Sequence, residues 1–399
     1  MPSDPAPERR PAGEGPAGAG LARDVLWPFL WTRLALAAVA WLGAQVSASW
    51  SYPFPEAARR GWAFVRWLPL DAFGRWDAHW YLDLAARGYV PRGAPGEAQS
   101  NLAFFPLYPW LVRGADALVP AAWRGPGSLY LCAVLVSSAA AVAALALLVR
   151  FGREVTGDPA AASRAALLLL LFPTGFVLSA PYPESLFLLL TLASLRAGWH
   201  GRPGVAGALG ALAALSRPGG ALLAVPLAWM ALSPPGGGRP RGRPLARLAP
   251  ALLPAAGLAL HAANLWRLTG DPLALLHVQA AWGRSLAAPW RTFLAPGDFH
   301  PWMGPLEAAS VAGVAALGAW GLRERRTRAL GAWALVSLLP VALSGTLLSA
   351  TRFAGVLFPC FLALGALARR PAVGRGAAIV FATLQGALFL LWSRFFWVA

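Results

Sequence analysis

The stretch SLYLCAVLVSSAAAVAALALLV at residues 128–149 contains no charged side chain and is followed directly by Arg150. About 20 apolar residues in a helix are enough to cross the hydrocarbon core of a bilayer. The whole chain of 399 residues has this character, because 57% of it is hydrophobic and only 13% is charged, against about 25% charged in soluble domains. Lipid-facing helices need no charged side, so the sequence predicts an all-α polytopic membrane protein.

The apolar segments predict about eleven transmembrane helices in a single domain at residues 25–399. Residues 1–24 are rich in Pro, Gly and Ala and are expected to form a disordered cytoplasmic tail. The first extracytoplasmic loop is expected at about 50–127. The expected spans are 25–49, 128–149, 165–181, 184–198, 204–217, 219–232, 249–266, 304–322, 329–346, 353–368 and 377–393.

The orientation follows from the basic residues, all 34 of which are arginine in a chain of net charge +17. Arginines between apolar spans set membrane topology, so their number does not predict a nucleic-acid partner. RERRTR at 323–328 and ARRP at 368–371 mark cytoplasmic segments. This places the N-terminus in the cytoplasm and predicts a multi-pass protein of the cell membrane. It also requires residues 101–120 to be a juxtamembrane or re-entrant segment, because a further crossing would put the arginines of 150–164 outside.

Metal and nucleotide chemistry have no motif in this sequence. There is no HExxH, Walker or GxSxG pattern, and no Cys/His cluster has ligand spacing. Cys132 and Cys360 both lie inside apolar runs, where they are expected to be small core residues and to form no disulfide. The sequence therefore predicts no cofactor and offers no metal-binding motif, although a divalent metal stays open as an alternative.

The first outer loop contains GRWDAHWYLDLAARGYVPRG at 74–93, in which aromatic and apolar residues recur at helical spacing. This pattern predicts an amphipathic helix at the membrane interface. Asp77 stands at the start of that helix, where it is either an N-cap or a functional carboxylate. Arg75 and His79 are neighbours that could orient or tune Asp77. Trp76 is either an interface anchor or a surface for a sugar ring.

Further polar residues lie at the expected outer turns. SAPYPESLF at 179–187 places Tyr182 and Glu184 where one helix ends and the next begins, so Glu184 is either a first-turn stabiliser or a functional acid. SRPGG contains Arg217 and SATRF contains Arg352, on the same predicted side of the membrane. Two arginines at helix ends suit a phosphate, which the planar guanidinium binds through paired hydrogen bonds.

Taken together, RWDAHWYLDLAARGY, AFFPLYP, PYPESLF, SRPGG and the late TRF resemble the PIG-V-type mannosyltransferases, which add the second mannose of the GPI anchor in eukaryotes. GDPLALLHVQAAWGR at 270–284 resembles the bacterial branch of that family. The resemblance runs from about residue 74 to about 360. One departure is Pro218-Gly219, where the eukaryotic pattern has an Asn-Gly pair.

The family is similar in architecture to the GT-C glycosyltransferases, so the resemblance implies a GT-C-like fold. It implies an inverting mannosyltransferase that moves a hexose from a polyprenyl-phosphate sugar to a lipid or glycan acceptor at the extracytoplasmic face. Asp77 is the implied general base. The candidate substrate-binding residues are Arg75, Trp76, His79, Tyr108, Tyr182, Glu184, Arg217, Gln279, Trp282, Arg284 and Arg352.

A transporter or lipid flippase is the alternative reading, because it too would have many helices and few polar residues. Such a protein is expected to carry polar residues within its spans and often shows an inverted repeat. Here the spans carry almost no charge, no repeat is visible, and the candidate polar residues fall on one side. The pattern therefore favours the enzyme over transport, and over a non-enzymatic membrane scaffold.

Overall fold

The computed structural model describes residues 20–46, 55–91, 93–235, 244–294 and 303–398. Within these ranges the chain folds into helices joined by turns and loops, without a strand, which confirms the predicted all-α class. The longer helices are α2 (Trp27–Val46), α5 (Ala78–Arg87), α6 (Leu107–Ala117), α7 (Pro126–Thr156), α8 (Pro159–Leu171), α9 (Glu184–Trp199), α10 (Pro203–Ser216), α11 (Ala224–Leu232), α13 (Leu253–Thr269), α16 (Gly304–Gly321), α17 (Arg328–Val336), α20 (Phe358–Leu367) and α21 (Pro371–Ser393). The shorter ones are α3 (Pro55–Arg60), α4 (Leu68–Asp71), α12 (Pro244–Leu248), α14 (Ala274–His277), α15 (Pro289–Leu294), α18 (Leu339–Ala342) and α19 (Ala350–Ala354).

Four described helical segments are long and apolar enough to cross a membrane, namely Ala22–Val46, Pro126–Thr156, Leu245–Thr269 and Pro371–Ser393. Several other apolar helices have only 10–17 residues, which is short for a full crossing of the hydrocarbon core. The chain is thus a membrane protein, while the number of about eleven crossings stays a prediction.

Some expected spans are interrupted, and the span expected at 165–181 shows why. Helix α8 ends at Leu171, before Pro173, because the residue preceding a proline is disfavoured in the helical conformation. The side chain of Gln385, from α21, then donates to the carbonyl oxygens of Leu170 and Phe172 at 2.8 and 2.7 Å. These bonds satisfy backbone acceptors that the end of a helix leaves open. A distant helix therefore stabilises an early helix end.

The tail expected at residues 1–24 lies mostly outside the described residues. Residues 22–24, however, are already helical, as part of a π-helical turn Ala22–Leu26 that leads into α2. Asp24 is buried there, and its Oδ2 atom lies 2.8 Å from Nη2 of Arg153 in α7. This ion pair stabilises the helical turn at residues 22–26. The composition of the tail could not predict it, because Arg153 lies far away in the sequence.

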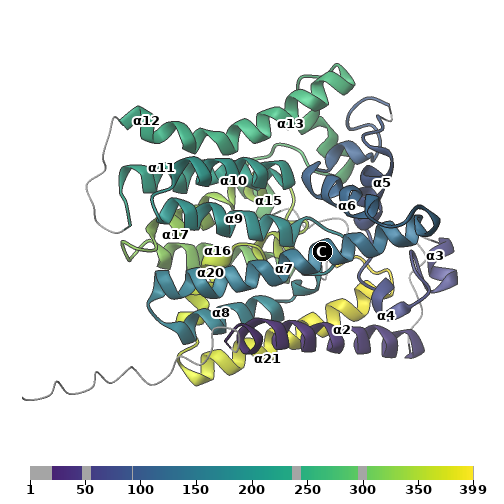
Figure 1. The fold of residues 1–399 in the computed structure, drawn as a ribbon, viewed down its shortest axis with the longest axis horizontal. Helices are drawn as coiled ribbons and strands as arrows, with labels where there is room; N and C mark the ends of the chain where they lie inside the picture. The colour runs from purple at the N-terminus through teal and green to yellow at the C-terminus, as the bar shows by residue number, and fades with distance from the viewer. Residues whose placement is uncertain (1–19, 47–54, 92, 236–243, 295–302, 399) are drawn as a thin grey trace, which may run out of the picture.

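The long helices run side by side, and the segments of the first loop gather at one end of them (Figure 1). Helices α3, α4, α5 and α6 lie at that end, whereas α12 lies at the opposite end. The predicted amphipathic helix is present as α5, which buries Trp80, Leu82 and Leu84. Helix α6, within the predicted juxtamembrane segment, has 11 residues and is too short to cross a bilayer.

A buried ion pair holds this loop against the bundle. Asp71 accepts hydrogen bonds from the backbone N–H groups of Ala63, Phe64 and Val65 at 2.7–2.9 Å. Its Oδ2 atom also lies 2.8 Å from Nη1 of Arg75, and both side chains are fully buried. Arg75 donates in addition to the carbonyl oxygen of Ser393, at the end of α21. The loop is thereby joined to the C-terminal helix.

The orientation can be tested with two cysteine reporters at exposed positions on opposite ends of the bundle. We expect the Arg325→Cys variant, altered within RERRTR, to react with a membrane-impermeant thiol reagent only after the cells are opened. The Ala98→Cys variant, altered in the first loop, should react in intact cells, because the positive-inside rule places the arginine-rich segments in the cytoplasm. Both positions are exposed, whereas the native Cys132 and Cys360 are buried. Labelling of the Arg325→Cys variant in intact cells would reverse the orientation.

Candidate functional site

Asp77 precedes the first residue of α5, yet its side chain makes no capping hydrogen bond. Its Oδ2 atom instead accepts a hydrogen bond from Nη1 of Arg352 at 3.0 Å. The backbone N–H of Asp77 donates to the hydroxyl of Tyr182, which donates to the carbonyl oxygen of Arg75, both at 3.0 Å. The Asp77 side chain remains 24% exposed. The sequence left Asp77 as either a helix cap or a functional carboxylate, and its side chain does not cap α5.

The backbone just before Asp77 explains this orientation. Trp76 has a φ of 53°, a left-handed conformation that bulky residues rarely adopt. Its indole Nε1 donates to the carbonyl oxygen of Phe396 at 3.1 Å. The C-terminal segment thus holds Trp76 in place, and the chain turns so that Asp77 faces the bundle.

Asp77, Glu184, Arg217 and Arg352 form an ion-pair network that we call the charge cluster. The Oε1 atom of Glu184, at the start of α9, lies 3.1 Å from Nη1 of Arg217 and 3.4 Å from Nε of Arg352. The Glu184 side chain is only 2% exposed. Its other oxygen, Oε2, is buried and accepts no hydrogen bond from a described residue. Four residues from separate motifs are therefore joined at one place.

The SRPGG turn places Arg217 in this cluster. Helix α10 ends at Ser216, and Arg217 is extended before a 3₁₀ turn begins at Pro218. A Cβ atom on Gly220 would lie only 2.2 Å from the backbone nitrogen of Ala214. Glycine is thus required for the turn to pack closely against α10. This packing fixes the direction in which the Arg217 side chain leaves the backbone.

Arg352, in the TRF motif, is positioned by a carboxylate on another helix, that of Glu307. Both oxygens of Glu307, in α16, accept hydrogen bonds from the first amides of α19, those of Ser349 at 3.1 Å and Ala350 at 2.5 Å. Helix α19 is thereby fixed with Arg352 directed at the cluster. Burial alone would lower the pKa of Arg352, but the carboxylates of Glu184 and Asp77 outweigh it and raise this pKa above its ordinary value.

Arg284 reaches the same region from the loop that follows α13. It donates to Oε1 of Gln279 at 3.3 Å and to the carbonyl oxygen of Leu348 at 3.4 Å. The guanidinium carbons of Arg217, Arg284 and Arg352 lie 4.7, 5.5 and 5.7 Å from the centre of the Phe353 ring. Burial lowers the pKa of Arg284 to about 10, and repulsion from Arg352 adds to this effect. Three arginines therefore surround one aromatic ring.

Aromatic side chains join the first loop to the loop that follows α13, beside the charge cluster. Trp282 packs edge-on against Trp80 and Phe104, with ring centres 6.1 and 5.7 Å apart.

The ring centre of Tyr81 lies 5.7 Å from the ring centres of both Tyr182 and Tyr108. The Tyr108 hydroxyl bonds to α7, through the Ala133 carbonyl and the Ser137 hydroxyl. The last contact directs this hydroxyl into the bundle.

The predicted site residues thus divide into two groups. The residues that come together are Asp77, Tyr182, Glu184, Arg217, Arg284 and Arg352, and Gln279 joins them by its bond to Arg284. Trp282 contacts Trp80 and Phe104 instead, Trp76 is bonded to Phe396, and Tyr108 is bonded to α7. The Arg75 side chain is instead committed to Asp71, while Nδ1 of His79 lies 2.6 Å from the Trp76 carbonyl oxygen. Sequence reasoning missed Phe353 and Tyr81, although each adjoins a residue or motif that it had singled out. It also missed Asp71, for which the sequence offers no local signal.

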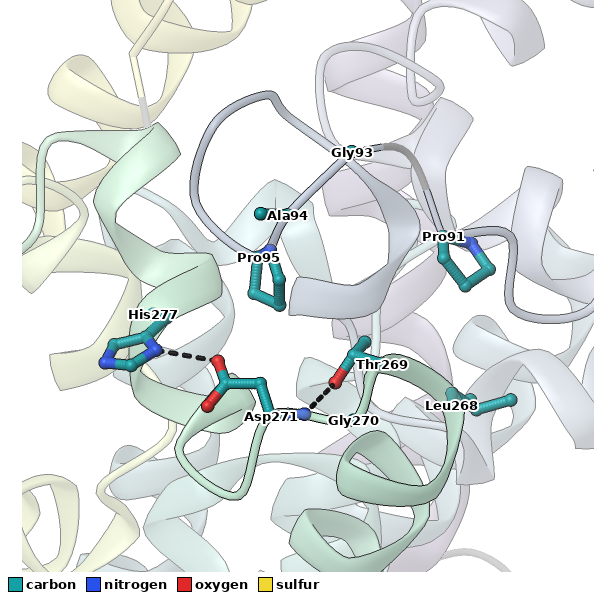
Figure 2. A pocket seen from close by; sticks show the side chains of 9 residues that line it. All are labelled: Pro91, Gly93, Ala94, Pro95, Leu268, Thr269, Gly270, Asp271 and His277. Carbon is teal, nitrogen blue, oxygen red and sulfur yellow. Dashed lines mark hydrogen bonds and ion pairs between the residues drawn. The ribbon is translucent and has the colours of Figure 1, made fainter.

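Two cavities lie near these loops but are not lined by the charge cluster. One, of about 500 Å³, lies between Pro91 and Gly93–Pro95 on one side and the segment that carries His277 on the other (Figure 2). The Nδ1 atom of His277 is 2.7 Å from Oδ2 of Asp271. The other, of about 700 Å³, lies along α5 and α6 and is lined by His79, Asp83 and Arg113 among others. Across the described ranges, no group of three or more His, Cys, Asp or Glu residues could hold a metal ion.

Residues 67–225 match the family model described as mannosyltransferase (PIG-V), which confirms the resemblance inferred from the motifs within that range. The resemblance of residues 270–284 to a bacterial branch stays a prediction. GPI alpha-1,6-mannosyltransferase 2 of Rattus norvegicus is 34% identical over 154 residues, covering 38% of this chain and 30% of that protein. The Homo sapiens protein of the same name is 36% identical over 133 residues, covering 32% and 25%. The chain thus spans less than a third of the length of these relatives. Asp77, Glu184 and Arg217 lie inside the matched region.

The oligosaccharyltransferase of Archaeoglobus fulgidus in its apo form gives a TM-score of 0.49 at 15% identity, over 93% of this chain and 56% of that chain.

Proposed function

Because residues 67–225 match the mannosyltransferase (PIG-V) family model, we propose that this chain is a GT-C-like membrane mannosyltransferase of the plasma membrane. It moves a hexose from a polyprenyl-phosphate sugar to a lipid or glycan acceptor at the extracytoplasmic face, and its N-terminus is cytoplasmic. The observation that carries the proposal is the contact between Asp77 and Arg352. It brings a partly exposed carboxylate next to arginines that suit a phosphate.

Asp77 is the best placed of the acids near the loop to act as the general base. Asp71 is saturated by three amides and Arg75, and Asp83 is paired with Arg87 and bonded to Asn101. Glu184 is buried between two arginines. Asp77 is more exposed than Glu184, and only its Oδ2 atom is engaged by a described residue. Its Oδ1 atom is therefore available to an acceptor hydroxyl.

In the proposed reaction the acceptor oxygen attacks the anomeric carbon of the donor, and the proton of that hydroxyl moves to Asp77. The bond between the anomeric carbon and the phosphate oxygen breaks, and its electron pair stays on the phosphate. Arg217 and Arg352 stabilise the charge that develops there. Direct displacement inverts the anomeric centre. Trp282 is the aromatic contact proposed for the sugar, whereas the Tyr182 side chain, also predicted to bind substrate, is fully buried and positions the backbone of Asp77.

The proposed function is tested by supplying the purified protein with radiolabelled polyprenyl-phosphate mannose and an extract of membrane lipids and glycans. We expect label to appear in an extractable product and free polyprenyl phosphate to accumulate in equal amount. A parallel reaction with polyprenyl-phosphate glucose tests the sugar. Recovery of all label in the donor, with folded protein that binds it, would contradict a transferase.

A further inference from the structure

The charges around Phe353 do not balance. Three guanidinium groups, those of Arg217, Arg284 and Arg352, lie within 6 Å of this ring. Two carboxylates, those of Asp77 and Glu184, are in ion-pair contact with Arg217 and Arg352. Among the described groups that are in direct contact here, three positive and two negative charges leave one positive charge over. A cation held away from water without a counter-ion is unfavourable, so the site is suited to one further negative charge.

Among the described residues, Arg284 is the one of these three arginines that has no carboxylate at ion-pair distance. Arg217 is paired with Glu184, and Arg352 with both Glu184 and Asp77. The two side-chain hydrogen bonds of Arg284 go to uncharged oxygens, at the long distances of 3.3 and 3.4 Å. The pKa of Arg284 is lowered because burial and the positive charges of the other arginines both disfavour its charged form. The unbalanced charge therefore resides on Arg284.

One further carboxylate, Glu307, lies close enough to affect these arginines. Both of its oxygens accept backbone N–H groups, from Ser349 and Ala350. The ion pairs of Arg217 and Arg352 within the described part of the chain go to Asp77 and Glu184, and none of them involves Glu307. Glu307 thus holds α19 and acts on Arg284 only from beyond ion-pair distance, which leaves Arg284 without a direct counter-ion among the described residues.

The net charge of the site also matches the charge of the donor phosphate before and after the proposed reaction. A sugar linked to a lipid through one phosphate carries one negative charge, which matches the single excess positive charge. When the bond to the sugar breaks, the phosphate becomes a monoester with a charge approaching about −2. In the same step Asp77 takes up the acceptor proton and loses its own negative charge. The excess positive charge of the site therefore rises by one as the charge of the leaving phosphate grows.

Building on the proposed function, we propose that Arg284 is the primary anchor of the donor phosphate and that Glu184 sets the site's charge to select a lipid monophosphate sugar. Glu184 is a positioning residue in this account, since it acts through Arg217 and Arg352. Were its charge absent, two cations would lack a partner, and the site would suit a lipid diphosphate sugar, which carries one charge more.

The test is equilibrium binding, without acceptor, of two probes of equal chain length, a polyprenyl-phosphate mannose and a polyprenyl-diphosphate hexose. We expect Arg284→Gln to weaken binding of the monophosphate probe by roughly 10–100-fold, the loss of a charge-assisted contact. Arg291→Gln is the matched control, because Arg291 is an exposed arginine of the same loop, and it should bind as the parent does. We expect Glu184→Gln to shift the preference at least about tenfold toward the diphosphate probe.

Two results would overturn this inference. The first is an Arg284→Gln variant that binds the monophosphate probe within twofold of the parent. The second is a Glu184→Gln variant that changes the affinity for both probes by the same factor, as a purely structural residue would. Thermal unfolding of each variant shows that it is folded; if Glu184→Gln is not, the result for Arg284→Gln decides alone. This test measures binding, whereas the test of the proposed function measures transfer. A failure of mannosyl transfer would therefore contradict the proposed function without deciding the roles of Arg284 and Glu184.

Discussion

Replacing Asp77 by Asn is expected to lower the rate of sugar transfer by roughly 10²–10⁴-fold, the usual contribution of a general base. Asn has nearly the same size and can still accept a hydrogen bond from Arg352, but it cannot take a proton from the acceptor. Because the native side chain makes no capping hydrogen bond, helix α5 should not lose stability. The measurement is single-turnover transfer from radiolabelled donor, with expression, unfolding temperature and donor affinity determined alongside.

Asp83→Asn is the matched control for this prediction. Asp83 belongs to the same helix, but its partners are Arg87 and Asn101 rather than the charge cluster. Its loss should leave the rate of transfer near that of the parent. If Asp77→Asn retains parental turnover while Asp83→Asn or Glu184→Gln abolishes it, the general base is a different acid.

The second large effect is expected on stability, from Asp71→Asn. This change removes the negative charge next to Arg75 and leaves a fully buried guanidinium without its ion-pair partner. Breaking a buried pair from one side typically destabilises a protein by about 3–5 kcal/mol. The amide must also replace a carboxylate that accepts three backbone N–H groups. We expect a lower unfolding temperature in detergent and a larger aggregated fraction in size-exclusion chromatography.

Glu56→Gln provides the comparison, because Glu56 and Arg60 form an ion pair of the same helical spacing at 3.2 Å, with side chains 68% and 59% exposed. Exposed pairs of this kind contribute about 0–1 kcal/mol, so this variant should unfold close to the parent temperature. An Asp71→Asn protein as stable as Glu56→Gln would show that the buried pair does not hold the first loop. Activity lost by Asp71→Asn should be proportional to the folded fraction lost, whereas Asp77→Asn should remain folded.

The local features of this protein could be predicted from the sequence. Membrane character, the helix after Asp77 and the turns at Glu184 and Arg217 each depend on residues close together in the chain. Hydropathy, a proline at a helix start and glycines in a turn act over a few residues, so a short window contains the cause. The motifs also indicated the residues that meet at the charge cluster, because they lie at helix ends on one predicted side.

Only the tertiary structure decided how these residues pair and which of them are committed elsewhere. The partner of Asp77 is Arg352, 275 positions away, and the acid that balances Arg75 is Asp71 rather than Asp77. The early end of α8 depends in the same way on Gln385, more than 200 positions further on. Ion pairs and cap bonds of this kind depend on which helix ends packing brings within about 4 Å, and at such short range electrostatic interaction in a poorly solvated site is strong enough to fix a side chain. A linear sequence states which charges exist, whereas their separation in space is a property of the packed bundle.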